Sequence, residues 1–337
     1  MKAFQFFGNK DLRRVELPEP EIGENDVLLK IKKVGICGTD LHIYNGGMKV
    51  PIPLIMGHEF VGDVAKIGRN VTNVKIGDRA VAEHVIGCGK CLYCQQGKRN
   101  LCKNPTVIGL HRPGALAEYL SAPADLVYTL PTELSYDEGV LTEPLSIAVY
   151  AVRHEHVKVG DTVAVVGQGP IGLMVDQVAK HAGTVVFGFD MHDDRLQFAQ
   201  QHAYVFKAIN ITKPNFLEEF RQSIAADGAD IVFEAVGSDT SGELALELTR
   251  AAGNVTILGV FEHNVSINMM QIVKKELRIH GSWTCIQTFP QSLLLLKSKA
   301  IDTVDFITHR YPFTDTARAF QEASTDKINR IKSVIEF

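Results

Sequence analysis

The chain has 337 residues and a mass of 37.1 kDa, which is more than one ordinary hydrophobic core covers and predicts two domains. Hydrophobic residues make up 45% and charged residues 22%, which excludes a disordered, collagen-like or coiled-coil protein. A net charge of −4 leaves no basic excess for nucleic acid, and six cysteines are too few for a disulfide scaffold.

The N-terminal sequence MKAFQFFGNKDLRR brings in charge before an apolar run long enough for a signal peptide. The longest aliphatic run, at 293–296, is far shorter than a bilayer requires. We therefore expect a cytoplasmic protein without a membrane partner. In a reducing compartment, clustered cysteines are expected to bind metal rather than to form disulfides.

Residues 1 to about 150 contain short runs rich in β-branched residues, each bounded by Gly, Pro, Asn or Asp. This composition predicts a mainly antiparallel β domain. The clearest of the predicted strands cover residues 26–36, 59–68 and 78–86.

From about residue 158 to residue 281, apolar runs alternate with helical patterns, as expected for a parallel, doubly wound sheet. The predicted strands are 162–167, 184–190, 229–237, 254–260 and 277–282, and the predicted helices between them are 170–183, 215–225 and 241–253. After about residue 282, the sequence pattern predicts helices near 288–299 and 314–324, followed by a strand at 331–337.

A glycine-rich turn follows the first of these parallel strands and opens the first helix. Its sequence has the G-x-G-x-x-G pattern of dinucleotide-binding turns, in the strand–turn–helix context that the pattern requires. The glycines permit a tight turn and a close approach of the pyrophosphate to the helix N-terminus. The residues expected to bind the cofactor here are Gly167, Gly169, Pro170, Ile171 and Gly172.

Asp190 closes the second predicted strand, where a carboxylate can accept both ribose hydroxyls and repels a 2′-phosphate. This position favours NAD over NADP, although the nearby Arg195 leaves NADP open. Two later turns are expected to approach the cofactor because they follow parallel strands at the same edge of the sheet. They contain Val236 and Gly237, and Leu258 and Gly259.

Four cysteines form a C-x2-C-x2-C-x7-C pattern, at Cys88, Cys91, Cys94 and Cys102. Four thiolates can surround Zn²⁺ tetrahedrally and leave no open position, so the spacing predicts a structural zinc site. A reduced thiol cluster or a redox relay is the alternative interpretation.

A second set of metal-binding residue types is scattered over 107 positions: Cys37, His58, Glu59 and Glu143. Cysteine, histidine and carboxylate are all good zinc ligands, and three protein ligands leave a position for water or substrate. Spacing alone does not join these residues. Taken one at a time, Cys37 and His58 could be ordinary core residues, and Glu143 could be a charge at a helix N-terminus.

The motifs GICGTDLH, MGHEFVG, the four-cysteine segment, GDRA, TEPL and VGQGPIG follow one another in this order. This succession resembles the zinc-dependent medium-chain dehydrogenase/reductase family over essentially the whole chain. The resemblance implies an α/β protein with a β-rich GroES-like catalytic domain and a Rossmann domain that interrupts it. The implied boundaries are 1–150 for the first part of the catalytic domain, 151–284 for the NAD-binding domain and 285–337 for the C-terminal return.

The resemblance also assigns roles to residues. It implies that Cys37 and His58 are catalytic zinc ligands, and that Glu59 binds the metal directly or exchanges with water. Glu143 stands where many alcohol dehydrogenases have a third cysteine. A glutamate at this position resembles the polyol and threonine dehydrogenase branches instead. Thr39 and His42 match the residues that relay the alcohol proton. Cys285 has no role in the pattern and is expected to be a buried thiol.

The expected activity is the reversible, NAD-dependent oxidation of a secondary alcohol of a polyol to a ketone, with a catalytic and a structural zinc ion in each chain. The C-terminal stretch also resembles polyol-phosphate dehydrogenases, and GICGTDLHIYN resembles L-threonine dehydrogenases, so both substrates stay open. A non-catalytic binding protein on the same fold is the alternative class. Tyr44, His111 and Trp283 are candidate pocket residues, and the family suggests a homotetramer or homodimer.

Overall fold

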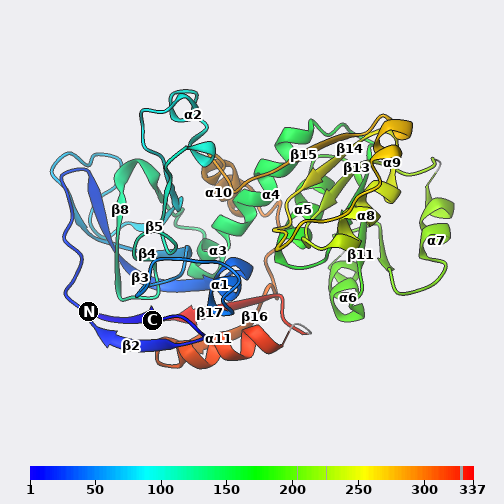
Figure 1. Ribbon diagram of the computed structural model, residues 1–337. Coiled ribbons are helices and arrows are strands. Elements are labelled where there is room, and N and C mark those ends of the chain that lie inside the picture. Colours follow the sequence, from blue (N-terminus) through cyan, green and yellow to red (C-terminus); the bar gives the residue numbers. More distant parts are fainter. Residues whose placement is uncertain (203, 225, 327–328) are drawn as a thin grey trace. The chain divides into compact units, whose positions relative to one another are not determined.

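Contacts between residues divide the chain into two units, both of which are interrupted in sequence. The first contains residues 1–146, 285–299 and 303–337, and the second contains 147–284 and 300–302. The computed structural model describes residues 1–202, 204–224, 226–326 and 329–337 (Figure 1). Within these ranges, every helix is too short or too polar to cross a bilayer.

The first unit is organised around a seven-stranded sheet in the order β16-β17-β3-β4-β5-β9, with β8 paired to β3. All of its pairs are antiparallel except β16–β17. The bounds are β3 Asp26–Ile36, β4 Glu59–Ile67, β5 Arg79–Ala82, β8 Tyr119–Pro123, β9 Val127–Thr129, β16 Ile307–Pro312 and β17 Lys332–Glu336. Two small sheets add β1 Lys2–Phe6 with β2 Leu12–Glu16, and β6 Val85–Ile86 with β7 Thr106–Val107.

Short helices connect these strands, and the mainly antiparallel β character expected from the sequence is confirmed. The helices are α1 Gly38–Tyr44, α2 Leu92–Gln95, α3 Tyr136–Val140, α10 Phe289–Lys297 and α11 Thr316–Thr325, with 3₁₀ turns at Arg99–Leu101, Ala124–Leu126 and Phe313–Asp315. The single strand expected over 78–86 is wrong in one respect, because the chain leaves the ladder at Glu83 and His84. Both side chains are buried in polar contacts instead.

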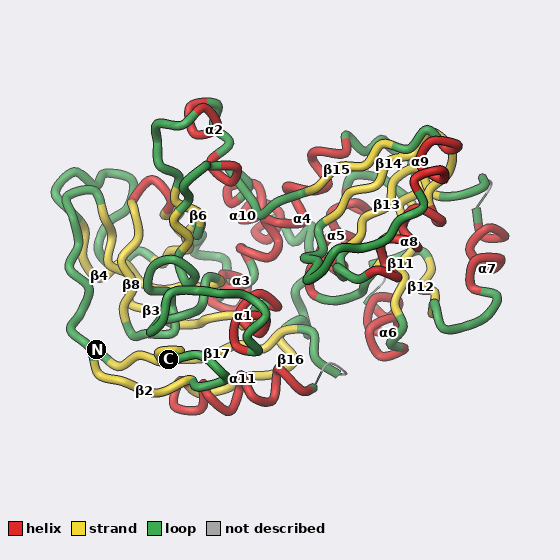
Figure 2. Tube along the Cα trace, viewed as in Figure 1, coloured by secondary structure: helices red, strands yellow, loops and turns green. Residues whose placement is uncertain are grey.

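The second unit contains a six-stranded parallel sheet in the order β12-β11-β10-β13-β14-β15 (Figure 2). Its strands are β10 Thr162–Val166, β11 Val185–Asp190, β12 Lys207–Asn210, β13 Ala229–Glu234, β14 Thr249–Ile257 and β15 Arg278–Gly281. The strand order reverses on either side of β10, which is the switch point where ligands bind in sheets of this kind. The parallel, doubly wound sheet expected from the sequence is therefore confirmed.

Helices link consecutive strands of this sheet. They are α5 Pro170–His181, α6 Asp193–Gln201, α7 Phe216–Ser223, α8 Asp239–Leu248 and α9 Met269–Lys275, while α4 Thr142–Glu155 begins in the first unit and continues into the second. Four of these elements, α4, α6, α9 and β12, were not expected from the sequence. The helix expected over 215–225 corresponds to α7, and its last residue, Ala225, lies outside the described residues.

The helix expected over 241–253 is wrong in its second half, because α8 ends at Leu248 and β14 begins at Thr249. The Thr249 hydroxyl donates to the Ala245 carbonyl over 2.6 Å and so occupies an acceptor of the last helical turn. Arg250 donates through Nε to Asp230 Oδ1 at 2.7 Å and is thereby fixed against β13. These tertiary contacts override the helical pattern of the segment.

Candidate functional site

The structure brings three of the scattered metal-binding residues together in the first unit. The donor atoms of Cys37, His58 and Glu59 all lie within 4.8 Å of one another. Cys37 is the N-cap of α1 and directly follows β3, while His58 and Glu59 stand at the start of β4. Because β3 and β4 are antiparallel neighbours, with Gly35 opposite Glu59, the end of one strand meets the beginning of the other.

Asp40 contacts two members of this group, Cys37 and His58. Its Oδ2 accepts a hydrogen bond from the Cys37 backbone N–H at 3.0 Å, and its Oδ1 lies 3.4 Å from His58 Nδ1. A carboxylate at this nitrogen fixes the imidazole ring and leaves Nε2 available as a ligand atom. Burial lowers the pKa of His58, but Asp40 and Cys37 raise it more, so that the pKa lies well above 6.5.

Glu59 is paired with Lys332, a residue that was not expected at this site from the sequence. Lys332 Nζ donates to Glu59 Oε1 at 2.6 Å, and both side chains are almost completely buried. A side chain at Gly35 would collide with the Glu59 carboxylate and approach the Lys332 stem, so glycine makes room for the pair. The residues are 273 positions apart, and no local pattern in the sequence joins them.

Glu143 belongs to a different group in this structure. Its carboxylate lies within 4.8 Å of donor atoms of His84 and Cys285, and its Oε1 is 3.3 Å from His84 Nδ1. The two groups are neighbours, because the rings of His58 and His84 are 5.3 Å apart. The expected role of Glu143 as a zinc ligand stays a prediction.

Burial controls the electrostatics of this second group. It raises the pKa of Glu143 to about 8, and the negative charge of Glu59 raises it further in the same direction. It lowers the pKa of His84 to about 3, with a smaller contribution from His58. It also raises the pKa of the Cys285 thiol, which is buried as expected. Two carboxylates and two thiols therefore share a region that a cation would stabilise.

The donor set around Cys37 fits Zn²⁺ on chemical grounds. A thiolate, an imidazole and a carboxylate are all ligands that zinc accepts, and three protein ligands leave a position for substrate. The donors are buried to half-buried, and Asp40 already orients the imidazole as in metal sites with a second layer of hydrogen bonds. Cys37, His58 and Glu59 would hold the metal here, with Glu143 near by.

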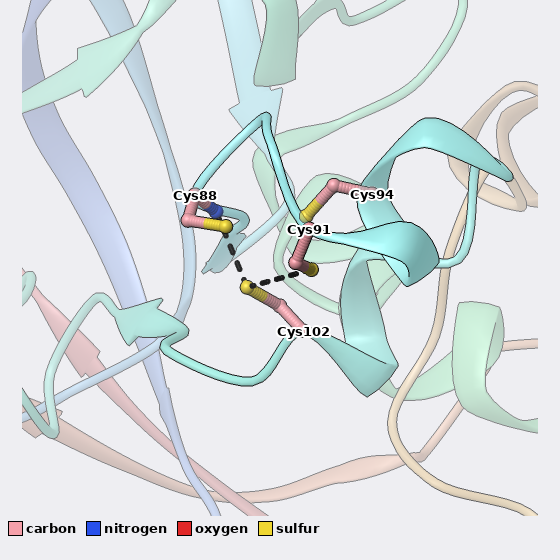
Figure 3. Close-up of side chains that lie close together, drawn as sticks. All are labelled: Cys88, Cys91, Cys94 and Cys102. Carbon is pink, nitrogen blue, oxygen red and sulfur yellow. Dashed lines mark hydrogen bonds between the residues drawn. The ribbon is translucent and has the colours of Figure 1, made fainter.

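The four clustered cysteines converge on one point (Figure 3). Their sulfur atoms lie within 4.8 Å of one another, with 3.9 Å between Cys91 Sγ and Cys102 Sγ. Backbone N–H groups of Cys88 and Asn104 donate to Cys102 Sγ at 3.2 and 3.4 Å and hold this sulfur in place. Four sulfur donors fit a tetrahedral Zn²⁺ site with no open position. We call residues 88–102 the four-cysteine lobe.

Thr39 and His42 lie on α1, immediately after Cys37. They are three residues apart and therefore on the same face of the helix, and both side chains are partly exposed. Of the candidate pocket residues, Tyr44 belongs to the core between Phe6 and Phe320, with ring centroids 6.3 and 5.6 Å away.

The other two candidate pocket residues are exposed. The His111 ring accepts a hydrogen bond from the Val107 N–H at 3.1 Å, so it serves a local turn. Trp283 is 55% exposed and lies in the second unit, beyond β15. Their expected place in a substrate pocket stays a prediction.

The glycine-rich turn has the geometry that dinucleotide binding requires. Gly167 follows β10 with φ +98°, and Gly169 is the N-cap of α5, with Pro170 at its first position. A Cβ atom at Gly172 would overlap the Gly167 carbonyl, so the helix approaches the strand too closely for any side chain there. Ile171 is partly exposed in the first helical turn. The N-terminus of α5 is thus open to a phosphate group.

Asp190 ends β11 beside this turn. Its Oδ2 accepts from the Gln168 N–H at 2.7 Å and its Oδ1 from the His192 N–H at 3.0 Å, which fixes the carboxylate while leaving lone pairs for further donors. Arg195 Nη1 lies 3.7 Å from Asp190 Oδ2. The structure therefore places Asp190, whose carboxylate favours NAD, beside Arg195, whose guanidinium could accommodate the 2′-phosphate of NADP.

The two later turns are also adjacent. Glu234 Oε1 accepts from the N–H groups of Val236 and Gly237, both at 2.8 Å, and the Leu258 N–H donates to the Glu234 carbonyl at 2.8 Å. Gly259 packs so closely against Gly237 that a Cβ atom would not fit. Val236, Gly237 and the residues after Gly259 line a cavity of about 460 Å³ within the second unit. The sequence missed Glu234, which shapes both turns.

The fold and these sites define a two-unit protein with donor sets for two zinc ions and a dinucleotide-binding turn. Residues 23–132 match the model of the alcohol dehydrogenase GroES-like domain, and residues 170–298 match that of the zinc-binding dehydrogenases. The chain belongs to the zinc-dependent medium-chain dehydrogenase/reductase family, which confirms the family and fold class expected from the motifs.

Two curated relatives illustrate the range of substrates. The chain is 33% identical over 345 residues to sorbitol dehydrogenase from Bacillus subtilis, covering 99% of this chain and 97% of the relative. It is 34% identical over 323 residues to L-threonine 3-dehydrogenase from Salmonella newport, covering 94% of each chain. The protein is therefore an oxidoreductase of the zinc-dependent alcohol dehydrogenase type.

Two solved structures carry a bound cofactor. An alcohol dehydrogenase from E. coli CFT073 complexed with NADH has a TM-score of 0.94 and 30% identity, covering 100% of this chain and 99% of the other. A zinc-binding dehydrogenase from Sinorhizobium meliloti 1021 bound to NADP has a TM-score of 0.92 and 29% identity, with the same coverage. Both nicotinamide cofactors thus occur among the structural relatives.

Proposed function

We propose that the protein is an NAD-dependent zinc enzyme that reversibly oxidises a secondary alcohol of a polyol to a ketone. The observation that carries this proposal is the convergence of Cys37, His58 and Glu59, which are brought together by β3, α1 and β4 in a protein that also has a dinucleotide turn. The 33% identity to a sorbitol dehydrogenase supports a polyol as substrate.

Bound Zn²⁺ supplies a Lewis acid that lowers the pKa of the alcohol, and NAD supplies the hydride acceptor. The residues of this chain hold and orient these groups. Asp40 keeps the His58 ring in place, and Lys332 balances the charge of Glu59. Thr39 would accept the hydroxyl proton, and His42 would pass it to solvent from the same face of α1.

The preference for NAD rests on Asp190. Its carboxylate is held by two backbone N–H groups at the end of β11, where it would accept the ribose hydroxyls and repel a 2′-phosphate. Arg195, 3.7 Å away, moderates that repulsion. We therefore expect NAD to be used with a higher kcat/KM than NADP.

L-threonine is the second candidate substrate, because the chain is 34% identical to an L-threonine 3-dehydrogenase over 94% of its length. A polyol phosphate is the remaining alternative, suggested by the C-terminal stretch at 274–283 together with 307–310. A non-catalytic role would not require one chain to combine all six expected catalytic residues, which are Cys37, Thr39, His42, His58, Glu59 and Glu143.

A substrate screen tests these alternatives. Purified protein with two zinc ions per chain is mixed with NAD or NADP and with polyols, polyol phosphates or L-threonine, and NADH formation is followed at 340 nm. We expect polyols to give the highest kcat/KM. A higher value for L-threonine or for a polyol phosphate would replace the proposed substrate, and no turnover on any alcohol would support the binding protein.

We further propose a homo-oligomer and a cytoplasmic location. In support of the first, β15 is an edge strand with an exposed Ile279, and the preceding helix α9 exposes Met269, Met270 and Val273. A second copy pairing along this edge would cover them. Light scattering coupled to gel filtration would distinguish a monomer from a dimer or tetramer, and cell fractionation would test the location.

A further inference from the structure

Glu83 is a buried carboxylate that neither the metal groups nor the cofactor turn include. It stands in the break between β5 and β6, and its side chain is 1% exposed. A fully buried charge is costly unless it is paired and hydrogen-bonded. The hydrogen-bond and ion-pair partners of Glu83 therefore indicate why the strand is interrupted at this residue.

Three segments that are distant in sequence donate to this carboxylate. Arg99, from the four-cysteine lobe, forms an ion pair with Oε2. The hydroxyl of Tyr128, on β9, donates to Oε1 at 3.0 Å, and the backbone N–H of Gln287 donates to the same oxygen at 3.1 Å. Burial raises the pKa of Tyr128 to about 12, and the negative charge of Glu83 adds to this increase.

Arg99 is an integral part of the lobe. It lies between Cys94 and Cys102, and its carbonyl accepts a hydrogen bond from the Cys102 N–H at 3.0 Å. A Cβ atom at Gly87 would lie 2.7 Å from Cys94 Sγ and 2.9 Å from Arg99 Cβ, so this glycine lets the two pack against the chain beside Glu83. The position of the guanidinium therefore depends on how the four cysteines are held.

On its other side, Glu83 is linked to the candidate catalytic site. The Nδ1 atom of the next residue, His84, lies 3.3 Å from Glu143 Oε1, and its ring is tilted by 52° against that of His58. Gln287 is two residues from Cys285, whose thiol shares a group with His84 and Glu143. One carboxylate thus fixes both chain segments that carry the neighbours of Glu143.

We propose that Glu83 is a positioning residue that couples the four-cysteine lobe to the candidate catalytic site through Arg99 on one side and His84 and Gln287 on the other. This inference rests on the proposed function, because it concerns the same metal centre. Disorder in the lobe would move Arg99, leave Glu83 without its cation and shift the segments around Glu143. The lobe then contributes to the properties of the catalytic metal as well as to stability.

The test replaces the cation of the pair. Arg99→Gln removes the charge, Arg99→Lys retains it, and Arg69→Gln serves as the matched control because Arg69 forms an exposed ion pair with Glu24 in the same unit. Each variant is prepared with zinc in the lobe and Co²⁺ in the catalytic site. The measurements are metal content, melting temperature, the visible Co²⁺ spectrum, and kcat and KM.

We expect Arg99→Gln to keep two metal ions per chain, to shift the Co²⁺ bands and to lower kcat about tenfold, the lower end of the effect of outer-layer metal-site residues. Arg99→Lys should recover most of the activity, and Arg69→Gln should match the wild type. A variant with a lower melting temperature but a wild-type spectrum and kcat would overturn the proposal, because it would show a purely structural role.

A second variant covers the case in which Arg99→Gln does not fold. Glu83→Gln keeps the Oε1 acceptor for Tyr128 and Gln287 but removes the charge and the acceptor for Arg99, so the same shift of the Co²⁺ bands is expected. An unchanged spectrum in this variant would also contradict the coupling. Because the spectrum needs no substrate, failure of the proposed function would be seen separately, as a wild-type protein that binds Co²⁺ normally but oxidises no alcohol.

Discussion

The two metal-binding regions of the first unit bring their donor atoms together in opposite ways. The four-cysteine lobe takes all its donors from residues 88–102, and three of its four cysteines are partly exposed. The Cys37 group takes donors from the end of β3 and the start of β4, and its charge balance from β17. A local loop can thus form a closed site, whereas an open site that must exclude water and hold buried charges depends on the whole sheet.

The largest expected effect comes from the open site. Cys37→Ser should lower kcat roughly 10³-fold, since Lewis-acid stabilisation of the transition state is worth several kcal/mol. Zinc content should fall from two ions to one per chain, as measured by mass spectrometry. Full turnover in this variant would refute the assignment of Cys37 to the metal.

Lys332→Met tests whether the open site depends on the lysine that β17 supplies to neutralise Glu59. Removing one partner of a buried pair costs about 3–5 kcal/mol, so the metal-free variant should unfold at lower urea concentration, and added zinc should recover part of the loss. Lys66→Met is the control, because its pair with Glu19 is exposed and should be worth about 1 kcal/mol or less. Equal losses in both variants would contradict a special role for the buried pair.

Breaking the lobe should have a smaller effect on catalysis. Cys94→Ser should release the lobe zinc and lower the melting temperature by roughly 5 °C or more, given that about 1 kcal/mol corresponds to 2–4 °C in a domain of this size. Activity should fall about tenfold at temperatures where the protein stays folded, through the Arg99–Glu83 pair. If Cys94→Ser abolished activity as completely as Cys37→Ser, the division into an open and a closed site would be wrong.

Asp190→Asn provides a reference outside both metal regions. It weakens the charged acceptor for the ribose, so KM for NAD should rise about tenfold, while kcat at saturating cofactor and zinc content stay unchanged. Steady-state kinetics with NAD and NADP would check this. A change in zinc content would mean that the second unit affects metal binding.

Glu155→Gln gives the smallest expected effect and shows what a buried carboxylate does without a metal group. Burial raises the pKa of Glu155 to about 7, where it accepts from Thr256 and lies 3.2 Å from His280. Because the pKa in the folded state is above the unfolded value, stability should fall as pH rises from about 4.5 to 7. The variant should flatten this dependence in urea unfolding curves, and the exposed Glu133→Gln should leave it unchanged.

The sequence predicted what is local and missed what is tertiary. The C-x2-C-x2-C-x7-C spacing predicted the lobe, and the G-x-G-x-x-G turn predicted the start of α5, because each needs only a few neighbouring residues. Asp40 was overlooked although it lies inside the GICGTDLH motif. Lys332 and Glu83 had no local signal, since their partners come from other strands and from the lobe.

The strand break at Glu83 and His84 could not have been predicted from periodicity either. The segment 78–86 has the β-branched residues and the flanking turn residues of a single strand, but the chain leaves the ladder where two polar side chains, Glu83 and His84, are buried among polar partners. Thr249 in β14 is a similar case. The sequence from 241 to 253 has a helical pattern, but the helix ends before Thr249 because the chain there pairs with β13. Polar contacts between distant segments decided both outcomes.

The pairing of β17 with β3 has a consequence for synthesis of the chain. Glu59 is translated 273 residues before Lys332, an interval on the order of tens of seconds at ordinary elongation rates. Until then the Glu59 carboxylate has no lysine to neutralise it, and β3 lacks a neighbour on that side. A zinc ion captured early by Cys37 and His58 would supply the missing positive charge, so metal availability during translation could determine how well the first unit folds.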